Sequence, residues 1–260
     1  MKERRNRIGP SLGMLYAVVA YLISAGALFW LFLASSGWLP YGFFDQESTW
    51  QSALGWNLAL ILIFALQHSI MARKAFKRWI SRFVADHLER STYALMSGVF
   101  LVFIILTWQP LPGFAWQIQE NWLRNTLYAI NFLAVGYVFV AASITNQFEL
   151  FGLRQAYLHW KGDSYFPLPF RRILMYRYSR HPMMLGMLVI LWSAPQMSLT
   201  HLTLSCLLSA YIFAGIQFEE KGLRHEFGQD YEKYWNEVGM FFTFPFRNRS
   251  QRAISAKANR

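Results

Sequence analysis

The feature that most constrains this chain is a series of long apolar runs. Four of them approach or reach the roughly 20 apolar residues with which an α-helix spans a bilayer. These four lie near 11–35, 54–72, 91–108 and 125–145. Two more, near 182–196 and 199–218, are separated only by a turn around Pro195, which predicts a tight helical hairpin. The chain is therefore predicted to be an all-α, polytopic integral membrane protein with about six transmembrane helices.

Composition supports this prediction by exclusion. The 260 residues are 55% hydrophobic and only 15% charged, well under the roughly 25% charged residues of a soluble domain. An aromatic share of 18% likewise excludes a disordered chain. The single cysteine, Cys206, excludes an intramolecular disulfide and a cysteine metal site, and no metal is expected.

The basic residues indicate how the helices are oriented. Cytoplasmic loops carry an excess of Lys and Arg, and with the N-terminus inside, all 25 Lys and Arg residues except Arg124 fall in inner segments. The presumed outer loop carries Asp45 and Glu47 instead. We therefore expect both termini in the cytoplasm. The net charge of +11 is explained by topology and by contacts with anionic lipids, without nucleic-acid binding.

Ionisable residues near the helix ends are the first candidates for chemistry, because such groups in membrane segments usually line a cavity. His68, near the inner end of the second run, is predicted either to face a cavity or to be a helix-end histidine. Glu149 and Arg154 flank Gly152, so they either converge on one pocket or form a helix-terminus ion pair.

A second group of polar residues surrounds the predicted hairpin. Arg180 and His181 directly precede Pro182, where a helix start would be electropositive and suited to a carboxylate or phosphate. Glu219 and Glu220 follow at the same face, and their shared negative charge requires a cation, either Arg180 or a ligand ammonium.

An amphipathic stripe follows the hairpin, formed by Leu223, Phe227, Tyr231 and Tyr234 at helical spacing. It predicts a cytoplasmic interfacial helix that lies on the membrane as a lid. The polar tail 247–260 is expected to be disordered.

The order of these motifs resembles the C-terminal cofactor core of the isoprenylcysteine carboxyl methyltransferase and phospholipid methyltransferase superfamily. The resemblance rests on Arg180-His181-Pro182 with Gly186, on the Glu pair and on Phe227-Gly228. It departs at Met184, where the family often has tyrosine.

Three earlier motifs resemble the methanethiol S-methyltransferase branch of this superfamily. They are Gln67–Arg73, Glu89–Tyr93 and Phe148–Gln155, with Glu149 in the place of an expected Asp. NnrU-like proteins share parts of the early helices. The resemblance implies one membrane domain, with four N-terminal helices over 11–146 and a cofactor-binding core over 147–246.

What the resemblance implies is methyl transfer from S-adenosyl-L-methionine to the sulfur of methanethiol, giving dimethyl sulfide, in a bacterial inner membrane. His68 is the expected thiol-activating base, with Tyr93, Glu149 and Arg154 as orienting or proton-accepting groups. The expected cofactor-binding residues are Tyr178, Arg180, His181, Pro182, Gly186, Glu219, Glu220, Phe227, Tyr231 and Tyr234.

Other functions stay open at this point. A prenylcysteine carboxylate or a phospholipid amine could replace the small thiol as acceptor, with Arg154 as a possible contact. The core also resembles sterol reductases, and an NnrU-like membrane protein need not be an enzyme. The sequence leaves open the oligomeric state and which of Glu219 and Glu220 faces the cofactor.

Overall fold

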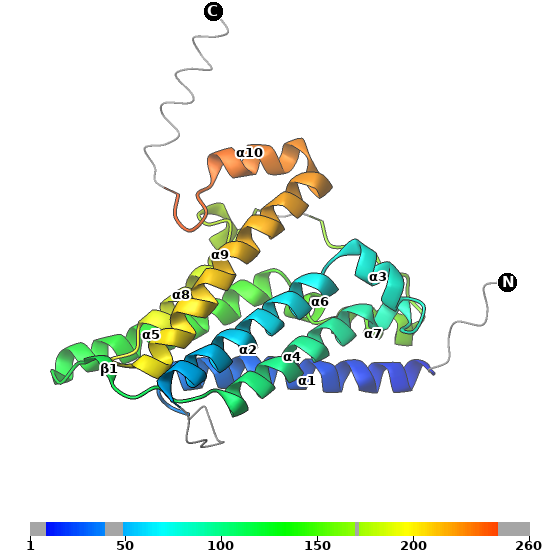
Figure 1. Ribbon diagram of the computed structural model, residues 1–260. Coiled ribbons are helices and arrows are strands. Elements are labelled where there is room, and N and C mark those ends of the chain that lie inside the picture. Colours follow the sequence, from blue (N-terminus) through cyan, green and yellow to red (C-terminus); the bar gives the residue numbers. More distant parts are fainter. Residues whose placement is uncertain (1–8, 40–48, 170–171, 244–260) are drawn as a thin grey trace, which may run out of the picture.

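The structure is a computed structural model that describes residues 9–39, 49–169 and 172–243. It is a bundle of long helices with a group of short elements at one end (Figure 1). Asp45, Glu47 and the tail 247–260, all of which entered the sequence predictions, lie outside the described residues.

Within the part of the chain that the structure describes, five helices are long and apolar enough to cross a membrane. They confirm the prediction of an all-α polytopic membrane protein. They are α1 (Pro10–Ser35), α2 (Trp50–Met71), α4 (Glu89–Thr107, preceded by the 3-10 turn η1, Asp86–Leu88), α5 (Asn121–Ile144) and α9 (Leu199–Phe227). Large apolar side chains on their outer faces are exposed, among them Leu62 and Phe132. Apolar exposure on this scale fits a surface that faces lipid.

The predicted run near 182–196 corresponds to a helix that is much shorter than the other five. Helix α8 (Pro182–Trp192) has 11 residues and is about 16 Å long, too short for a hydrocarbon core of about 30 Å. Beyond its end the chain forms strand β2 (Gln196–Ser198), which pairs antiparallel with β1 (Phe114–Gln117). The predicted turn around Pro195 is therefore replaced in part by a small sheet.

Small residues allow the long helices to approach one another closely. A Cβ added at Gly98 of α4 would lie 2.7 Å from the Cα of Ser24 on α1. A Cβ at Gly186 of α8 would similarly meet the side chain of Val138 on α5 at 2.5 Å. Small residues at helix crossings are the usual means of packing in membranes, where backbones must come close to gain van der Waals contact.

Buried amides also tie the helices together. Asn57 on α2 exchanges two hydrogen bonds with the backbone of Gln109, each 2.9 Å long. Asn131 on α5 donates to the Ile190 carbonyl at 3.1 Å and to Ser193 Oγ at 2.9 Å. Both amides are thus satisfied inside the protein, as the bilayer interior requires.

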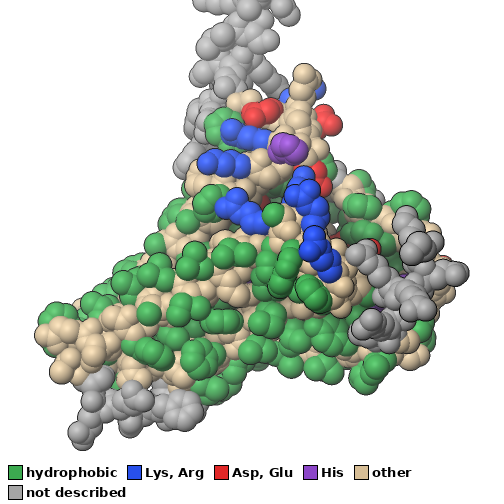
Figure 2. All heavy atoms as spheres, turned by 45° about the vertical axis from the view of Figure 1, so that its right-hand side comes forward, with side chains coloured by type: hydrophobic (Ala, Val, Ile, Leu, Met, Phe, Trp, Pro, Cys, Tyr) green, Lys and Arg blue, Asp and Glu red, His purple; other side chains and the backbone are tan. Residues whose placement is uncertain are grey.

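Charged side chains gather at one end of the molecule, which we call the basic end (Figure 2). Several short elements meet here: α3 (Lys74–Ile80), α6 (Gln147–Leu150), α7 (Leu153–Lys161), the 3-10 turn η2 (Leu174–Arg177) and α10 (Gln229–Glu237). The predicted amphipathic stripe is divided between the last turns of α9 and α10, because Gly228, with φ of 51°, turns the chain between them. Helix α10 then packs back on α9 (Figure 1).

Candidate functional site

The chain entering α8 is held by backbone hydrogen bonds from the segment after α10. The Arg180 amide donates to the Gly239 carbonyl at 3.0 Å, and the His181 amide donates to the Met240 carbonyl at 3.1 Å. Pro182 begins the helix, where its missing amide hydrogen has no consequence. The two amides just before the helix, which lie beside the predicted anion site, are therefore already paired within the protein.

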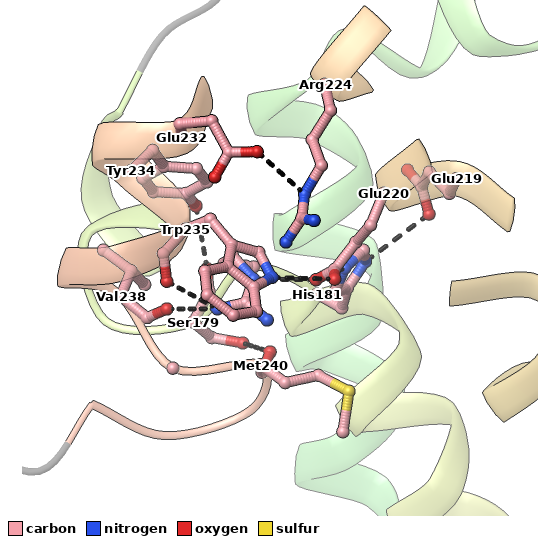
Figure 3. A network of polar contacts seen from close by, with 12 residues as sticks. Ser179, His181, Glu219, Glu220, Arg224, Glu232, Tyr234, Trp235, Val238 and Met240 are labelled. Carbon is pink, nitrogen blue, oxygen red and sulfur yellow. Dashed lines mark hydrogen bonds and ion pairs between the residues drawn. The ribbon is translucent and has the colours of Figure 1, made fainter. Parts of the chain in front are cut away.

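The Arg180 guanidinium is likewise engaged within the protein. It belongs to the polar network whose members Glu220, Trp235 and Val238 are labelled in Figure 3. Its Nε lies 2.7 Å from Glu220 Oε1, and both side chains are about nine-tenths buried, at 8% and 10% exposure. One of its terminal nitrogens donates to the carbonyls of Trp235 and Val238. Of the two cations that the sequence offered for the glutamate pair, Arg180 and a ligand ammonium, the structure places Arg180 on Glu220. The Arg180 side chain is thus held by Glu220 and by the segment around α10, and only 8% of it is exposed.

The structure distinguishes the two adjacent glutamates. Glu220 also accepts a hydrogen bond from the Trp235 indole at 3.0 Å and lies 3.1 Å from His181 Nε2. Glu219 points the other way: its carboxylate is 3.4 Å from His181 Nδ1, and its side chain is 46% exposed. His181 thus stands between a fully engaged carboxylate and one that is available to a ligand.

The aromatic stripe is buried rather than open. Tyr231 and Tyr234 are 1% and 2% exposed and pack in one cluster with Phe227. Burial raises the pKa of the Tyr231 hydroxyl to about 12 and raises that of Tyr234 as well. The Tyr234 hydroxyl donates to the Tyr176 carbonyl at 2.8 Å. Tyr234 thus joins α10 to the chain before α8, and Tyr231 packs beside it. The expectation that these tyrosines enclose the adenosyl group stays a prediction.

Two further expected cofactor residues lie in different surroundings. Gly186 packs against α5, as described above, whereas the Tyr178 side chain is 68% exposed. The Tyr178 carbonyl accepts a hydrogen bond from Thr243 at 2.7 Å. Neither residue shares a wall with the cavity into which Glu219 points.

His68, on α2, lies in a box formed by Phe64, Tyr93 and Tyr211, with ring centroids 4.8 to 6.1 Å away. Its Nε2 is 2.6 Å from the Tyr93 hydroxyl, and its Nδ1 is 3.0 Å from Ser97 Oγ. The Ser97 hydroxyl donates its only hydrogen to the Tyr93 carbonyl at 2.9 Å, so Ser97 accepts from His68. His68 Nδ1 therefore carries the hydrogen, and Nε2 accepts from Tyr93.

A cavity of about 370 Å³ has both Tyr93 and Glu219 in its lining. The full lining is Ala72, Lys77, Glu89, Arg90, Tyr93, Glu219, Gly222, Leu223 and Glu226. The cavity lies within the range of about 300–1,000 Å³ that small-molecule sites have, and it carries charges of both signs. We call it the Tyr93 cavity.

Glu149 and Arg154 form a separate network. Arg154 Nη1 lies 2.7 Å from Glu149 Oε2. Of the two predicted alternatives, a shared pocket and an ion pair, the structure shows the ion pair. Glu149 also accepts from Gln155 at 3.0 Å and from the Tyr165 hydroxyl, and Arg154 donates to the Phe166 carbonyl at 3.1 Å. These contacts hold the chain after α7 against α6, and neither residue lines the Tyr93 cavity.

A second, larger cavity of about 530 Å³ lies beside the first, between α3, η1 and α7. Gln155 and Tyr165 from the Glu149 network line it. Lys77, Glu89 and Arg90 line both cavities, and Lys77 and Glu89 are paired at 3.1 Å. These three residues thus form the partition between the two spaces.

Three residues of this arrangement were absent from the predicted site: Ser97, Lys77 and Arg90. Arg90 belongs to the Glu89–Tyr93 motif, where its position beside Tyr93 was a usable signal. Ser97 follows Tyr93 by one helical turn, so the spacing could have indicated it. Lys77 has no comparable signal, because its contact with the site depends on how α3 folds against α4.

The fold and the cavities together define a class: helical integral membrane proteins with polar cavities at one end of the bundle. Comparison with known proteins identifies the family. Residues 57–219, more than half of the chain, match the model of the NnrU protein family. No solved structure matches the chain significantly.

Individual relatives give the same result. Methanethiol S-methyltransferase of Pseudomonas sp. (strain GM41(2012)) is 36% identical over 94% of this chain and 94% of its own length. The protein of that name from Mycobacterium tuberculosis is 41% identical over 74% of this chain and 79% of its own length. Nurim from Sus scrofa is 28% identical over 74% and 75%. The chain belongs to the NnrU family. The names of its relatives indicate that it is a methyltransferase. The predicted family membership is thus confirmed.

Proposed function

We propose that this methyltransferase transfers a methyl group from S-adenosylmethionine to the sulfur of methanethiol, and that the Tyr93 cavity is the site. The names of the relatives support the thiol as acceptor. The observation that carries the proposal is that Tyr93, which is hydrogen-bonded to His68, lines the same cavity as Glu219. A pair that can accept a proton and a carboxylate that a ligand can reach would then serve one small space.

The residues of the cavity fit the proposed cofactor. The amino-acid part of S-adenosylmethionine has an ammonium and a carboxylate, and the lining offers both acidic and basic side chains. Glu219 would hold the ammonium, since Glu220 is occupied by Arg180. When bound, the cofactor supplies an electrophilic methyl group on a sulfonium.

The protein's part in the chemistry is to make the thiol a nucleophile, because the thiolate is the reactive form. Tyr93 is the member of the pair that reaches the cavity, and His68 stands behind it. The thiol proton passes to the Tyr93 oxygen while the tyrosine's own proton passes to His68 Nε2. Ser97 keeps that nitrogen free of hydrogen by accepting from Nδ1. General acid–base assistance of this kind contributes about 10²–10⁴-fold to a rate.

The location follows from the distribution of charge. We propose that the basic end faces the cytoplasm of a bacterial inner membrane, because an excess of Lys and Arg marks that side. The cofactor, which is polar, would then enter from the cytoplasm, and the apolar thiol could arrive through the lipid.

Headspace gas chromatography of the purified protein with S-adenosylmethionine and methanethiol tests the proposal. We expect cofactor-dependent dimethyl sulfide in the wild type and a loss of at least about 100-fold in Tyr93→Phe. The matched control is Tyr157→Phe, which changes an exposed tyrosine of α7 outside both cavities. If the cofactor binds but no dimethyl sulfide forms, the acceptor is not methanethiol.

A further inference from the structure

The proposed cofactor has a carboxylate, and the structure narrows the choice of its partner. The sequence pointed to Arg180, whose guanidinium is instead buried among Glu220 and two backbone carbonyls. That guanidinium is only 8% exposed and does not line the Tyr93 cavity, so a carboxylate bound in the cavity would not meet it. The cation must therefore come from the lining of the Tyr93 cavity.

Among the described residues, two cations line that cavity, Lys77 and Arg90. Lys77 already has a carboxylate partner, Glu89, at 3.1 Å. Arg90 differs: its Nε donates to the Leu150 carbonyl at 3.1 Å, which orients the side chain. Among the residues that the structure describes, its two terminal nitrogens have no hydrogen-bond or ion-pair partner.

Arg90 is also well placed for the reaction. It stands in the first turn of α4, three residues before Tyr93, and both line the cavity that Glu219 faces. The planar guanidinium fork matches a carboxylate in two parallel hydrogen bonds, which a lysine does not provide. A zwitterionic amino-acid group held between Arg90 and Glu219 would thus meet a charge of opposite sign at each end.

We propose that Arg90 binds the carboxylate of S-adenosylmethionine, and that Arg180 has the separate task of docking α10. This inference rests on the cofactor part of the proposed function and does not depend on the acceptor. It assigns Arg90 as a binding residue and makes the Tyr93 cavity selective for adenosyl compounds that keep the amino-acid carboxylate.

Binding calorimetry in detergent, without thiol, tests the assignment with two ligands: S-adenosylmethionine and its decarboxylated analogue. We expect the wild type to bind the analogue about 10- to 100-fold more weakly, the range for a charge-assisted hydrogen bond. In Arg90→Gln the affinity for S-adenosylmethionine should fall by the same factor, and the preference between the ligands should vanish. Arg78→Gln, an exposed arginine on α3 outside the cavity, is the control and should keep the preference.

A further variant separates charge from folding. Arg90→Lys loses the bond to Leu150 yet keeps a cation, so it should keep part of the preference for the carboxylate. An Arg90→Gln protein that prefers S-adenosylmethionine as strongly as the wild type would overturn the assignment while leaving the cofactor in place. A wild type that binds neither ligand would overturn the cofactor itself and, with it, this inference.

Discussion

The ion pair between Arg180 and Glu220 should control whether α10 stays docked, and Arg180→Met is the perturbation that tests this. The substitution removes the 2.7 Å contact and two backbone hydrogen bonds, and it leaves the Glu220 carboxylate about nine-tenths buried without its cation. Breaking one side of a buried pair costs about 3–5 kcal/mol. At about 1.4 kcal/mol for each factor of ten, the population with α10 undocked should rise by at least about 100-fold.

Hydrogen–deuterium exchange of the α10 amides in detergent measures that population directly, since local opening governs exchange. The double variant Arg180→Met with Glu220→Leu should recover part of the protection, because an apolar pair removes the uncompensated buried charge. The recovery is incomplete because the Trp235 indole and the two carbonyls lose their partners. The control is Lys161→Met, which removes a 3.4 Å contact with Asp163 at the end of α7, away from α10. Both side chains are about half exposed, so the effect should be at most about 1 kcal/mol.

The result that would refute this reasoning is specific. If Arg180→Met exchanges its α10 amides at the wild-type rate but no longer binds S-adenosylmethionine, Arg180 contacts the ligand and does not dock the helix. The Arg90 assignment would then fail as well, because it depends on Arg180 being unavailable.

Three further substitutions test other parts of the structure. Tyr93→Phe removes the hydroxyl between the cavity and His68, so kcat should fall about 10²–10⁴-fold. The cofactor affinity measured by calorimetry should be unchanged, and a loss of affinity would instead place Tyr93 in cofactor binding. Ser97→Ala removes the acceptor of His68 Nδ1 and should lower kcat about tenfold, the equivalent of one hydrogen bond. Ser97→Thr keeps a hydroxyl and should retain activity. Equal losses of kcat in the two variants would indicate that Ser97 acts by packing alone. Gly98→Ala places a Cβ 2.7 Å from the Ser24 Cα, and the resulting overpacking should cost about 1–3 kcal/mol, seen as a lower unfolding temperature; an unchanged temperature would contradict the close approach of α1 and α4.

Much of the fold was predictable because the bilayer imposes the same requirement on every crossing. The apolar runs near 11–35 and 125–145 correspond to α1 and α5 with differences of a few residues at their ends. The run near 182–196 was less informative, since apolar character alone does not reveal that α8 ends at Trp192 and continues into a strand. A short apolar stretch does not distinguish a helix from a strand, and the pairing with β1 depends on a distant segment.

The site divides in the same way. The chemical groups at the basic end were identifiable from residue type, because arginine, histidine and adjacent glutamates are costly next to lipid without a purpose. Their partners were not identifiable. Helical spacing puts Glu219 and Glu220 about 100° apart, but which of them meets Arg180, 40 residues earlier in the chain, depends on how α8 and α9 are rotated against each other.

The sequence therefore specifies the class of the protein and the list of reactive groups, since membrane insertion and residue chemistry are local properties. Packing between helices determines the roles. It pairs Arg180 with Glu220 beside α10 and brings Arg90, Glu219 and Tyr93 to the lining of one cavity. It also sets His68 against the Tyr93 hydroxyl. These outcomes depend on how the helices cross and how they are rotated against one another. Residues far apart in the chain determine both, so local sequence patterns do not predict them.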